Sequence, residues 1–535
     1  MKIKKIDRVI ALPIFSAILI GLSRWNLDFD SFIFVSFVPL FYFFEYTTNK
    51  NKPYLPRLFY TGKQYFGYGF LFSTVLICLF LYWINLVTII GFLGLILLFG
   101  LIFGFIFWYV SKIYHYIPKF APIWFSITWI FFEYLTNFSE FHFPWFAIGY
   151  GLKNKLYLLQ VLELGGLPLL SFCILGINYL LYLAFQSIVF STTAKNMIKG
   201  LKFLAIVIIL LLFWGGTGFW RMQQINKNTE EKTFKIALIQ GNIPQDLKWE
   251  EEMEEETFLI YERLAKEVVK NENPNLILYP EAALPSWLYI WPSEYYQLMS
   301  LVVDLNTPIF TGFPHYIDEL KYEGQDEPRL YYNAANLFTP DIVKHEKYYK
   351  NILVPFGERT PFLSLFPLLW KLQMGQANFE SGNSSVLYKI EDYTFTPLIC
   401  FEIAFPLFIK KTVQNINPDY LVNITNDAWF YRSIGTHQHA MMAVFRTIET
   451  RKQVFRVANT GYSFYTMPSG EMKAMTNLFE RCYLVAYLNT YHSKTPYIQY
   501  GYLLHLFLIT LFILQLAYII INSLKKRQVC NKKNS

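Results

Sequence analysis

The chain has 535 residues, of which 54% are hydrophobic, 19% aromatic and only 16% charged. This composition is too apolar for a soluble enzyme of this length, and it excludes a disordered chain. The formal net charge is +8, yet much of it stands in short runs beside apolar segments, as membrane topology requires, so we expect no nucleic-acid partner. The composition therefore indicates a protein integrated into a membrane.

The N-terminus carries Lys2, Lys4, Lys5 and Arg8 ahead of an apolar run. Secretory signals share this pattern, but no small-x-small cleavage site follows, whereas further apolar segments do. We therefore interpret residues 1–25 as an uncleaved membrane anchor.

Eight apolar segments predict membrane-spanning helices, each of which needs roughly 20 apolar residues. Positions 64–111 contain no Asp, Glu, Lys or Arg. They have room for two helices, with a break near Trp83, Ile84 and Asn85. The remaining predicted spans lie near 9–25, 28–46, 119–137, 168–189, 203–220 and 499–521.

Lysine and arginine are concentrated in alternate connections between these spans. Because cytoplasmic loops retain positive charge, both termini are predicted to be cytoplasmic and residues 221–497 to lie on the other side. In a bacterium with an outer membrane, that side is the periplasm and the membrane is the inner membrane. The basic connections are the N-terminus, 50–63, 112–119, 195–202 and the tail from Lys525 to Lys533, while 83–87 has no basic residue and 138–167 has only Lys153 and Lys155.

Residues 221–497 show a different pattern, in which short apolar runs alternate with helical or turn segments. The lengths of these runs suit buried strands, and 254–271 has the charged and apolar faces of a covering helix. We expect an α/β domain here, preceded by a membrane domain of about seven spans in 1–220 and followed by the last span and a basic tail in 498–535. The predicted strands are 234–240, 275–280, 307–313, 394–401 and 420–426.

The cysteines are scattered, without the CxxC or Cys/His spacing of a zinc site and without the spacing of a disulfide framework. His437 and His439 stand two residues apart, which is the wrong spacing for a pair of metal ligands on one helix face. Neither pattern points to a metal. The five cysteines are Cys78, Cys173, Cys400, Cys482 and Cys530.

Three segments of the α/β domain carry candidate reactive residues. Glu281 directly follows the predicted strand 275–280, Cys400 ends a predicted strand, and Lys350 opens KNILVPFGE, which also contains Glu358. Taken singly, a glutamate or lysine in such a place is usually a solvated loop charge, and a cysteine is usually a packing residue. Strand ends are nevertheless where such folds place their chemistry.

Taken together, the three residue types fit acyl transfer. A thiol attacks a carbonyl only as thiolate, so Cys400 needs a base within hydrogen-bond reach, and no histidine accompanies it in a known motif. Glu281 can be that base if burial raises its pKa. In that case, replacing it with glutamine should raise the pH at which Cys400 reacts. Lys350 and the backbone N–H after Cys400 can stabilise the oxyanion.

The order of the motifs resembles the nitrilase superfamily. PEAALPSW at 280–287, YYKNILVPFGE at 348–358 and LICFEIAFP at 398–406 present its Glu, Lys and Cys in the family's order. Within that superfamily the chain is similar to the apolipoprotein N-acyltransferases. This similarity rests on the arrangement of spans around one extracytoplasmic domain, on QGNIPQDLKW at 240–249 and on NDAWFYRSIGTHQHAMMAVFRTIETRKQVFRVANTGYS at 426–463.

The resemblance implies a two-step cycle. An acyl chain passes from the sn-1 position of a membrane phospholipid, typically phosphatidylethanolamine, to the reactive cysteine, and then to the α-amino group of the S-diacylglyceryl cysteine that begins an apolipoprotein. No metal or organic cofactor is implied; the partners are the membrane, the phospholipid and the diacylglyceryl apolipoprotein, and we expect a monomer. The implied site residues are Cys400 as nucleophile, Glu281 as base, Lys350 as oxyanion partner, Glu358 as a second acidic residue, and Glu402 and Trp249 at positions that matter for activity.

One residue departs from the family pattern. Members often have tyrosine directly after the reactive cysteine, where this chain has Phe401. A hydroxyl is therefore missing at that position, and the ring could pack an acyl chain instead. Asn426 and Asp427 are expected to organise a turn near the site rather than to act as acid or base.

Two other functions fit parts of the pattern. A nitrilase-like amidase on a membrane anchor would share Glu281, Lys350 and Cys400 but release its thioester to water. Eight spans are excessive for an anchor, and the motifs outside the triad favour acyl transfer. A catalytically inactive lipid-binding or scaffolding protein would have no use for the intact triad, which therefore favours an enzyme.

Residues 361–374, PFLSLFPLLWKLQM, form an apolar run after the Glu358 motif. One interpretation is a helix packed into the core of the α/β domain. The other is an arm on the outer leaflet that gates acyl-chain entry and keeps water from the thioester, since burying each such side chain is worth roughly 1.5 to 3 kcal/mol. Pro367 limits a regular helix there, and Lys371 can keep its charge at the head groups.

Overall fold

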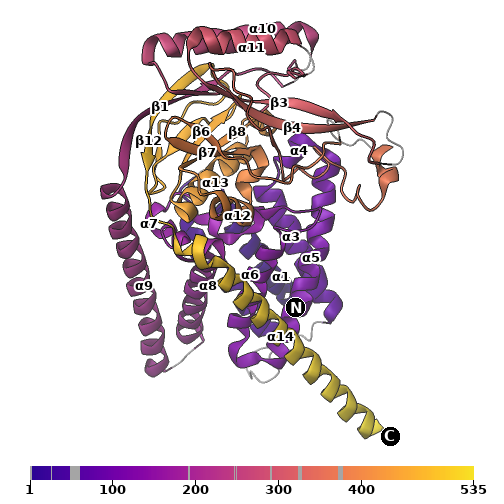
Figure 1. The fold of residues 1–535 in the computed structure, drawn as a ribbon. Coiled ribbons are helices and arrows are strands. Elements are labelled where there is room, and N and C mark those ends of the chain that lie inside the picture. Colours follow the sequence, from indigo (N-terminus) through magenta and orange to yellow (C-terminus); the bar gives the residue numbers. More distant parts are fainter. Residues whose placement is uncertain are drawn as a thin grey trace. The chain divides into compact units, whose positions relative to one another are not determined.

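The computed structural model describes residues 3–25, 27–48, 61–190, 193–245, 247–248, 250–289, 292–322, 328–371 and 378–534. The chain divides into two compact units (Figure 1). Residues 137–143 cluster with the second unit although they stand between two helices of the first. The first, which we call the helical unit, comprises Met1–Thr136, Pro144–Trp220 and Tyr500–Ser535, and the second, the α/β unit, comprises Asn137–Phe143 and Arg221–Gln499.

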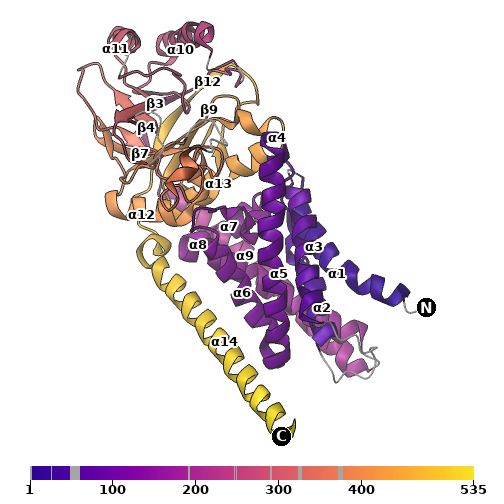
Figure 2. The ribbon, with the colours of Figure 1, turned by 90° about the vertical axis from the view of Figure 1, so that its right-hand side faces the viewer.

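Close helix packing in the helical unit depends on small residues. Helix α3 (Gly62–Phe80) runs alongside α5 (Ile89–Tyr116) in both views (Figures 1 and 2). A Cβ atom on Gly69 would lie 2.2 Å from the carbonyl oxygen of Phe103, so the two backbones can approach this closely only at a glycine. The run of residues without charge therefore forms an antiparallel helix pair.

The predicted break in that run is present. Helix α3 ends at Phe80, and the short α4 (Ile84–Val87) precedes α5, whose first turn is capped by the Thr88 hydroxyl. Further helices of the unit are α1 (Ile3–Leu22), α2 (Val38–Thr48), α6 (Ala121–Leu135), α7 (Leu156–Leu159), α8 (Leu162–Val189), α9 (Ala194–Lys227) and α14 (Pro496–Asn534).

Within the described residues, five stretches are long and apolar enough to cross a membrane. They coincide with five of the predicted spans. The other three predicted segments also form helices, α1, α3 and α6, which are not among the five. Several such helices make this a multi-pass membrane protein. The five stretches are Asp30–Thr48, Ile89–Tyr116, Leu162–Val189, Ala194–Lys227 and Pro496–Lys526.

Charged side chains inside the helical unit have protein partners. The Nζ atom of Lys153 lies 3.0 Å from Asp30 Oδ1, and both side chains are buried. Glu133, in α6, accepts a hydrogen bond from the Ser171 hydroxyl at 2.6 Å. Lys153 is thus a buried partner of Asp30. It is therefore not one of the solvated lysines that indicate on which side of the membrane a loop lies.

The described residues of the α/β unit form two six-stranded sheets, ordered β12-β1-β2-β3-β4-β5 and β11-β10-β9-β8-β7-β6. Strands β1 to β3 run parallel in the first sheet and β7 to β9 in the second. Their bounds are β1 Glu230–Gln240, β2 Leu276–Leu278, β3 Ile309–Asp318, β4 Arg329–Phe338, β5 Tyr348–Tyr349, β6 Tyr388–Ile390, β7 Tyr393–Ile399, β8 Tyr420–Thr425, β9 Gln453–Ala458, β10 Phe464–Thr466, β11 Met472–Lys473 and β12 Cys482–Thr490.

Alternation along β1 shows how the layers of this unit stack. Ile236 and Leu238 point into the core between the two sheets, where they meet Phe395 of β7. Ala237 and Ile239 point to the other face, which α10 (Glu251–Glu272) and α11 (Pro292–Leu305) cover. Since successive side chains of a strand alternate between faces, a buried strand of this kind is apolar throughout.

Two helices cover the outer face of the second sheet, α12 (Pro406–Ile416) and α13 (Ile434–Thr450). Figure 2 shows the resulting order of layers, with α10 and α11 at one end and α12 and α13 at the other. The five predicted strands all overlap observed strands, and the predicted helix 254–271 lies within α10. The prediction of an α/β fold is therefore confirmed.

The apolar run after Glu358 divides between the two interpretations given above. Leu363 and Trp370 are buried, and Trp370 stacks on Tyr322 with a centroid distance of 5.4 Å. Leu365 and Leu368 are 69% and 67% exposed. One face of this segment thus packs on the α/β unit while the other carries exposed apolar side chains; residues 372–374 lie outside the described residues.

Candidate active site

The candidate residues come together because they follow strand ends. Glu281 stands three residues after β2, Lys350 directly after β5, and Cys400 directly after β7. The first sheet supplies Glu281 and Lys350, and the second supplies Cys400. Because the two sheets pack face to face, residues that are far apart in sequence meet at one edge.

Lys350 lies between two carboxylates. Its Nζ atom is 3.2 Å from Glu281 Oε1 and 2.8 Å from Glu358 Oε1. The amide of Asn333, in β4, donates to the same two oxygens at 2.8 and 3.0 Å. All four side chains are buried. Such a network favours one fixed geometry, because each of the two Oε1 atoms accepts from both Lys350 and Asn333.

The pKa of Glu281 shifts in the direction opposite to the one that burial alone would give. Burial acts to raise its pKa, but Lys350, Asn333 and Lys248 outweigh burial and hold the pKa of this carboxyl below its ordinary value. The condition stated for Glu281 as the base, a pKa raised by burial, is therefore not met, because a desolvated cation at 3.2 Å favours the charged form. Glu281 is therefore an ionised carboxylate.

The thiol of Cys400 shows the opposite behaviour. Burial and the negative charge of Glu281 raise the pKa of Cys400, while Lys350 and a hydrogen bond with Thr425 oppose the shift. The resting residue is therefore a neutral thiol. A thiol that attacks a carbonyl must lose its proton, and the carboxylate of Glu281, which interacts electrostatically with Cys400, is a group that can accept one.

A second lysine supports the turn at Glu281. Lys248 is buried, and its Nζ atom donates to the Glu281 carbonyl oxygen at 3.2 Å. Burial lowers the pKa of Lys248 to about 8. It stands in the QGNIPQDLKW motif beside Trp249, which lies outside the described residues.

Glu402 braces the loop that carries the lysine. It is fully buried and accepts hydrogen bonds from the backbone N–H groups of Ile399 and Asn351, both at 2.6 Å, and from the Tyr348 hydroxyl at 2.7 Å. Burial raises its pKa to about 7. Glu402 thereby ties the strand before Cys400 to the residues on either side of Lys350.

Phe401 belongs to an aromatic cluster. Its ring meets Phe405 at 5.0 Å and His142 at 5.9 Å between centroids. His142 comes from the segment Asn137–Phe143, and its Nε2 atom lies 3.0 Å from the Leu353 carbonyl oxygen. The residue after Cys400 thus packs on aromatic rings of the α/β unit, and its packing on an acyl chain stays a prediction.

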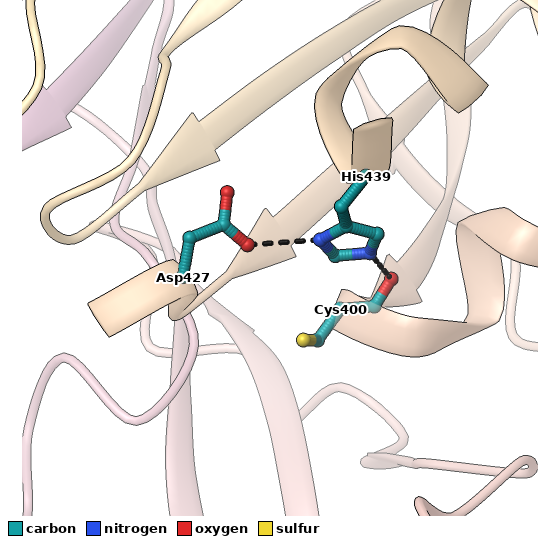
Figure 3. A group of neighbouring side chains, drawn as sticks. All are labelled: Cys400, Asp427 and His439. Carbon is teal, nitrogen blue, oxygen red and sulfur yellow. Dashed lines mark hydrogen bonds and ion pairs between the residues drawn. The ribbon is translucent and has the colours of Figure 1, made fainter. Parts of the chain in front are cut away.

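The structure also brings to Cys400 two residues that were not assigned a role there, His439 and Arg456, together with Asp427, which was expected at a turn near the site. His439 Nε2 lies 3.1 Å from the Cys400 carbonyl oxygen, and His439 Nδ1 lies 2.9 Å from Asp427 Oδ1 (Figure 3). Arg456 completes the group, 2.7 Å from Asp427 Oδ2. No spacing along the chain predicts this group, because it joins α13, β9 and the turn after β8.

Cys400, Asp427 and His439 have potential ligand atoms within 4.8 Å of one another. Protein groups already occupy these atoms, however. Arg456 and His439 bind the Asp427 carboxylate, and both ring nitrogens of His439 face protein oxygens. A metal ion would have to displace these contacts, so the geometry favours a hydrogen-bonded support for the cysteine.

Two family models match the chain. Residues 16–180 match the apolipoprotein N-acyltransferase N-terminal domain, and residues 235–492 match the carbon-nitrogen hydrolase. The apolipoprotein N-acyltransferase of Geobacter metallireducens is 31% identical over 70% of both chains. The chain belongs to the apolipoprotein N-acyltransferase family. Its relatives include the enzyme of Photobacterium profundum, 30% identical over 70% of this chain and 69% of that one, and the enzyme of Chlorobaculum tepidum, 26% identical over 89% and 90%.

The two matched family domains of this apolipoprotein N-acyltransferase family member correspond to the two units of the chain. The N-terminal family domain falls on the apolar helices, and the carbon-nitrogen hydrolase domain falls on the two packed sheets. The chain is therefore a multi-pass membrane acyltransferase of lipoprotein biosynthesis with a nitrilase-like domain.

Proposed function

We propose that the protein transfers an acyl chain from a membrane phospholipid, through a thioester on Cys400, to the α-amino group of the S-diacylglyceryl cysteine of an apolipoprotein. This is the last step of lipoprotein maturation. The observation that carries the proposal is the buried Glu281, Lys350 and Glu358 network beside the Cys400 thiol. It supplies a base, a cation and a nucleophile at one sheet edge.

In the first half-reaction, Glu281 takes the Cys400 proton as sulfur attacks the ester carbonyl of the phospholipid. Lys350 and the backbone N–H after Cys400 stabilise the oxyanion of the tetrahedral intermediate. The carbon–oxygen bond then breaks, the lysophospholipid alkoxide takes the proton back from Glu281, and the thioester remains. Because Lys350 stays protonated between two carboxylates, which raise its pKa, it acts as a fixed charge and not as an acid.

In the second half-reaction, the apolipoprotein amine attacks the thioester. Glu281 accepts a proton from the attacking nitrogen, the carbon–sulfur bond breaks, and the sulfur regains a proton. The products are an amide-linked third acyl chain and the free thiol. The cycle is balanced without a metal or an organic cofactor, and a single copy of the chain holds all the groups that it needs.

We further propose eight spans, with both termini in the cytoplasm and the α/β unit on the periplasmic face of the inner membrane. The alternation of lysine and arginine between connections supports this orientation. The burial of Lys153 against Asp30 also supports it, because Lys155 is then the one lysine of the connection at 138–167 that is not paired with Asp30. Impermeant amine reagents should label lysines of the α/β unit in spheroplasts, whereas Lys52 and Lys63 should stay protected until the membrane is broken.

A hydrolase with the same three residues is the competing function. Mass spectrometry of a lipoprotein N-terminus from cells with and without this protein separates the two. Transfer predicts a third acyl group only when the protein is present. A third acyl group in both samples, or in neither, would sink the proposal.

A further inference from the structure

The backbone at Cys400 needs external support. Its φ angle is +48°, in the left-handed region that non-glycine residues rarely adopt. Such a conformation persists only where the surroundings determine it. The direction of the Cys400 Sγ atom relative to Glu281 depends on this turn, so whatever holds the turn also aims the nucleophile.

The ring of His439 makes the contact that holds it. The Cys400 carbonyl oxygen points at the ring, while its sulfur points away (Figure 3), and the separation from His439 Nε2 is 3.1 Å. A carbonyl can only accept, so Nε2 carries the proton and donates it. His439 is 1% exposed, and water therefore does not compete for this contact.

The ring is itself held from the other side. His439 Nδ1 lies 2.9 Å from Asp427 Oδ1 and 3.2 Å from the Arg456 guanidinium. With a proton on Nδ1 the ring donates to Asp427, and without one it accepts from Arg456, so Nε2 keeps its proton in both forms. Gly461 leaves room for the Asp427 carboxylate in this position, because a Cβ on that glycine would lie 2.5 Å from the Oδ2 atom.

The turn after β8, which contains Asp427, also holds Glu281, the proposed base. The backbone N–H of Asn426 donates to Glu281 Oε2 at 2.9 Å, and the next residue is Asp427. One turn after β8 therefore fixes the Glu281 carboxylate directly and the Cys400 carbonyl through His439. If either contact shifts, the distance and direction between the Glu281 carboxylate and the Cys400 thiol change.

We infer that His439 is a positioning residue that aims Cys400 by donating its Nε2–H to the carbonyl of the strained turn, with Asp427 and Arg456 fixing the ring. The inference rests on the proposed role of Cys400 as nucleophile. His439 does not touch the reacting atoms. It acts on catalysis through the geometry of the thiol, where misplacement by about 1 Å can cost on the order of 10²-fold in rate.

Two amide substitutions separate this role from a general structural one. His439→Asn places an amide nitrogen where Nδ1 was, so it keeps the contact with Asp427 and loses the one with Cys400. His439→Gln places its amide nitrogen near the former Nε2 and can still donate to the carbonyl. We expect His439→Asn to slow acylation by phospholipid vesicles about 10-fold to 100-fold in kcat with KM nearly unchanged, and His439→Gln to retain most of the rate.

The rate at which iodoacetamide alkylates Cys400 is measured on the same samples, because it reports on the thiol without any acyl donor. It should fall in the Asn variant and recover in the Gln variant. The control is His437→Gln, in the same helix, whose ring lies against Tyr462 at a centroid distance of 6.5 Å; it should behave like the unmodified protein.

Equal rates for the Asn and Gln variants, with melting temperatures equal to that of the unmodified protein, would overturn the inference. Failure of both variants to fold would also overturn it, since the histidine would then be purely structural. Failure of the unmodified protein to form an acyl adduct would refute the proposed function instead, so the two failures are distinguishable.

Discussion

Both units bury charged side chains, but the two groups of charges are arranged differently. In the helical unit, Asp30 and Lys153 form a closed pair whose other contacts include the backbone N–H of Asn154. In the α/β unit, Lys350 is shared by two carboxylates, and the Cys400 thiol adjoins the group. The pair of Asp30 and Lys153 neutralises both charges and holds two segments of the fold together. Buried charge alone therefore does not identify an active site. A potentially reactive group beside the charges, such as the Cys400 thiol, is also needed.

The largest effect is expected at that reactive neighbour. Cys400→Ala should abolish the single acyl mass that phospholipid adds to the protein, an adduct that neutral hydroxylamine removes from a thioester. Cys482→Ala, in β12, is the matched control and should leave the adduct intact. An adduct that survives Cys400→Ala would show that another residue is the nucleophile.

The next effect tests the shared network. Glu281→Gln and Lys350→Met should each slow the first half-reaction on the order of 10²-fold to 10³-fold. Their effects on the free thiol should differ in sign. Glu281 raises the pKa of Cys400 and Lys350 lowers it, so removing Glu281 should shift alkylation by iodoacetamide to lower pH, and removing Lys350 should shift it to higher pH.

The expected shift for Glu281→Gln is opposite to the one predicted from the sequence. That prediction considered only the loss of the proton acceptor, which would raise the pH at which Cys400 reacts. The structure shows that the Glu281 carboxylate also repels a thiolate electrostatically. Slow acyl transfer combined with easier alkylation in Glu281→Gln would separate its role as a base from its charge. A shift to higher pH would contradict the electrostatic account.

In the helical unit, we expect substitutions of the buried ion pair to lower stability and to leave catalysis unchanged. Asp30→Asn should leave Lys153 as a buried charge without its counter-ion and destabilise the protein by about 3–5 kcal/mol, measured by thermal unfolding in detergent. The double variant Asp30→Leu with Lys153→Met should regain most of that stability. Activity per folded molecule should be unchanged in both, in contrast to the network at Lys350.

The smallest effect on stability is expected on the exposed face of the apolar segment after Glu358. Leu365→Ser with Leu368→Ser should leave the melting temperature nearly unchanged, because both side chains are more than half exposed. If this face gates acyl entry, the variant acylates slowly from vesicles and loses its thioester to water faster. Leu363→Ser, at a fully buried position, is the control that should unfold the protein more easily. Unchanged rates in the first variant would remove the segment from the mechanism.

Local patterns predicted much of the molecule. The break near Trp83, the five strands and the helix 254–271 all appear, because each depends on residues close together in the chain. Strands β4, β5, β6, β9, β10, β11 and β12 were not predicted. β12 has partly exposed positions, and it is recognisable only through its antiparallel pairing with β1.

The positions of Glu281 and Cys400 could be predicted from the sequence, because each follows an apolar run and an α/β fold places such positions at a sheet edge. Lys350 instead follows a charged stretch and the two-residue strand β5, which was not predicted. Only the tertiary structure decided their charge states and their support. The pKa of Glu281 falls because Lys350 approaches it from another strand, and His439 reaches the Cys400 turn from a helix 39 residues further along the chain. Coulombic and hydrogen-bond energies depend on distances in space, and those distances exist only once the two sheets have packed.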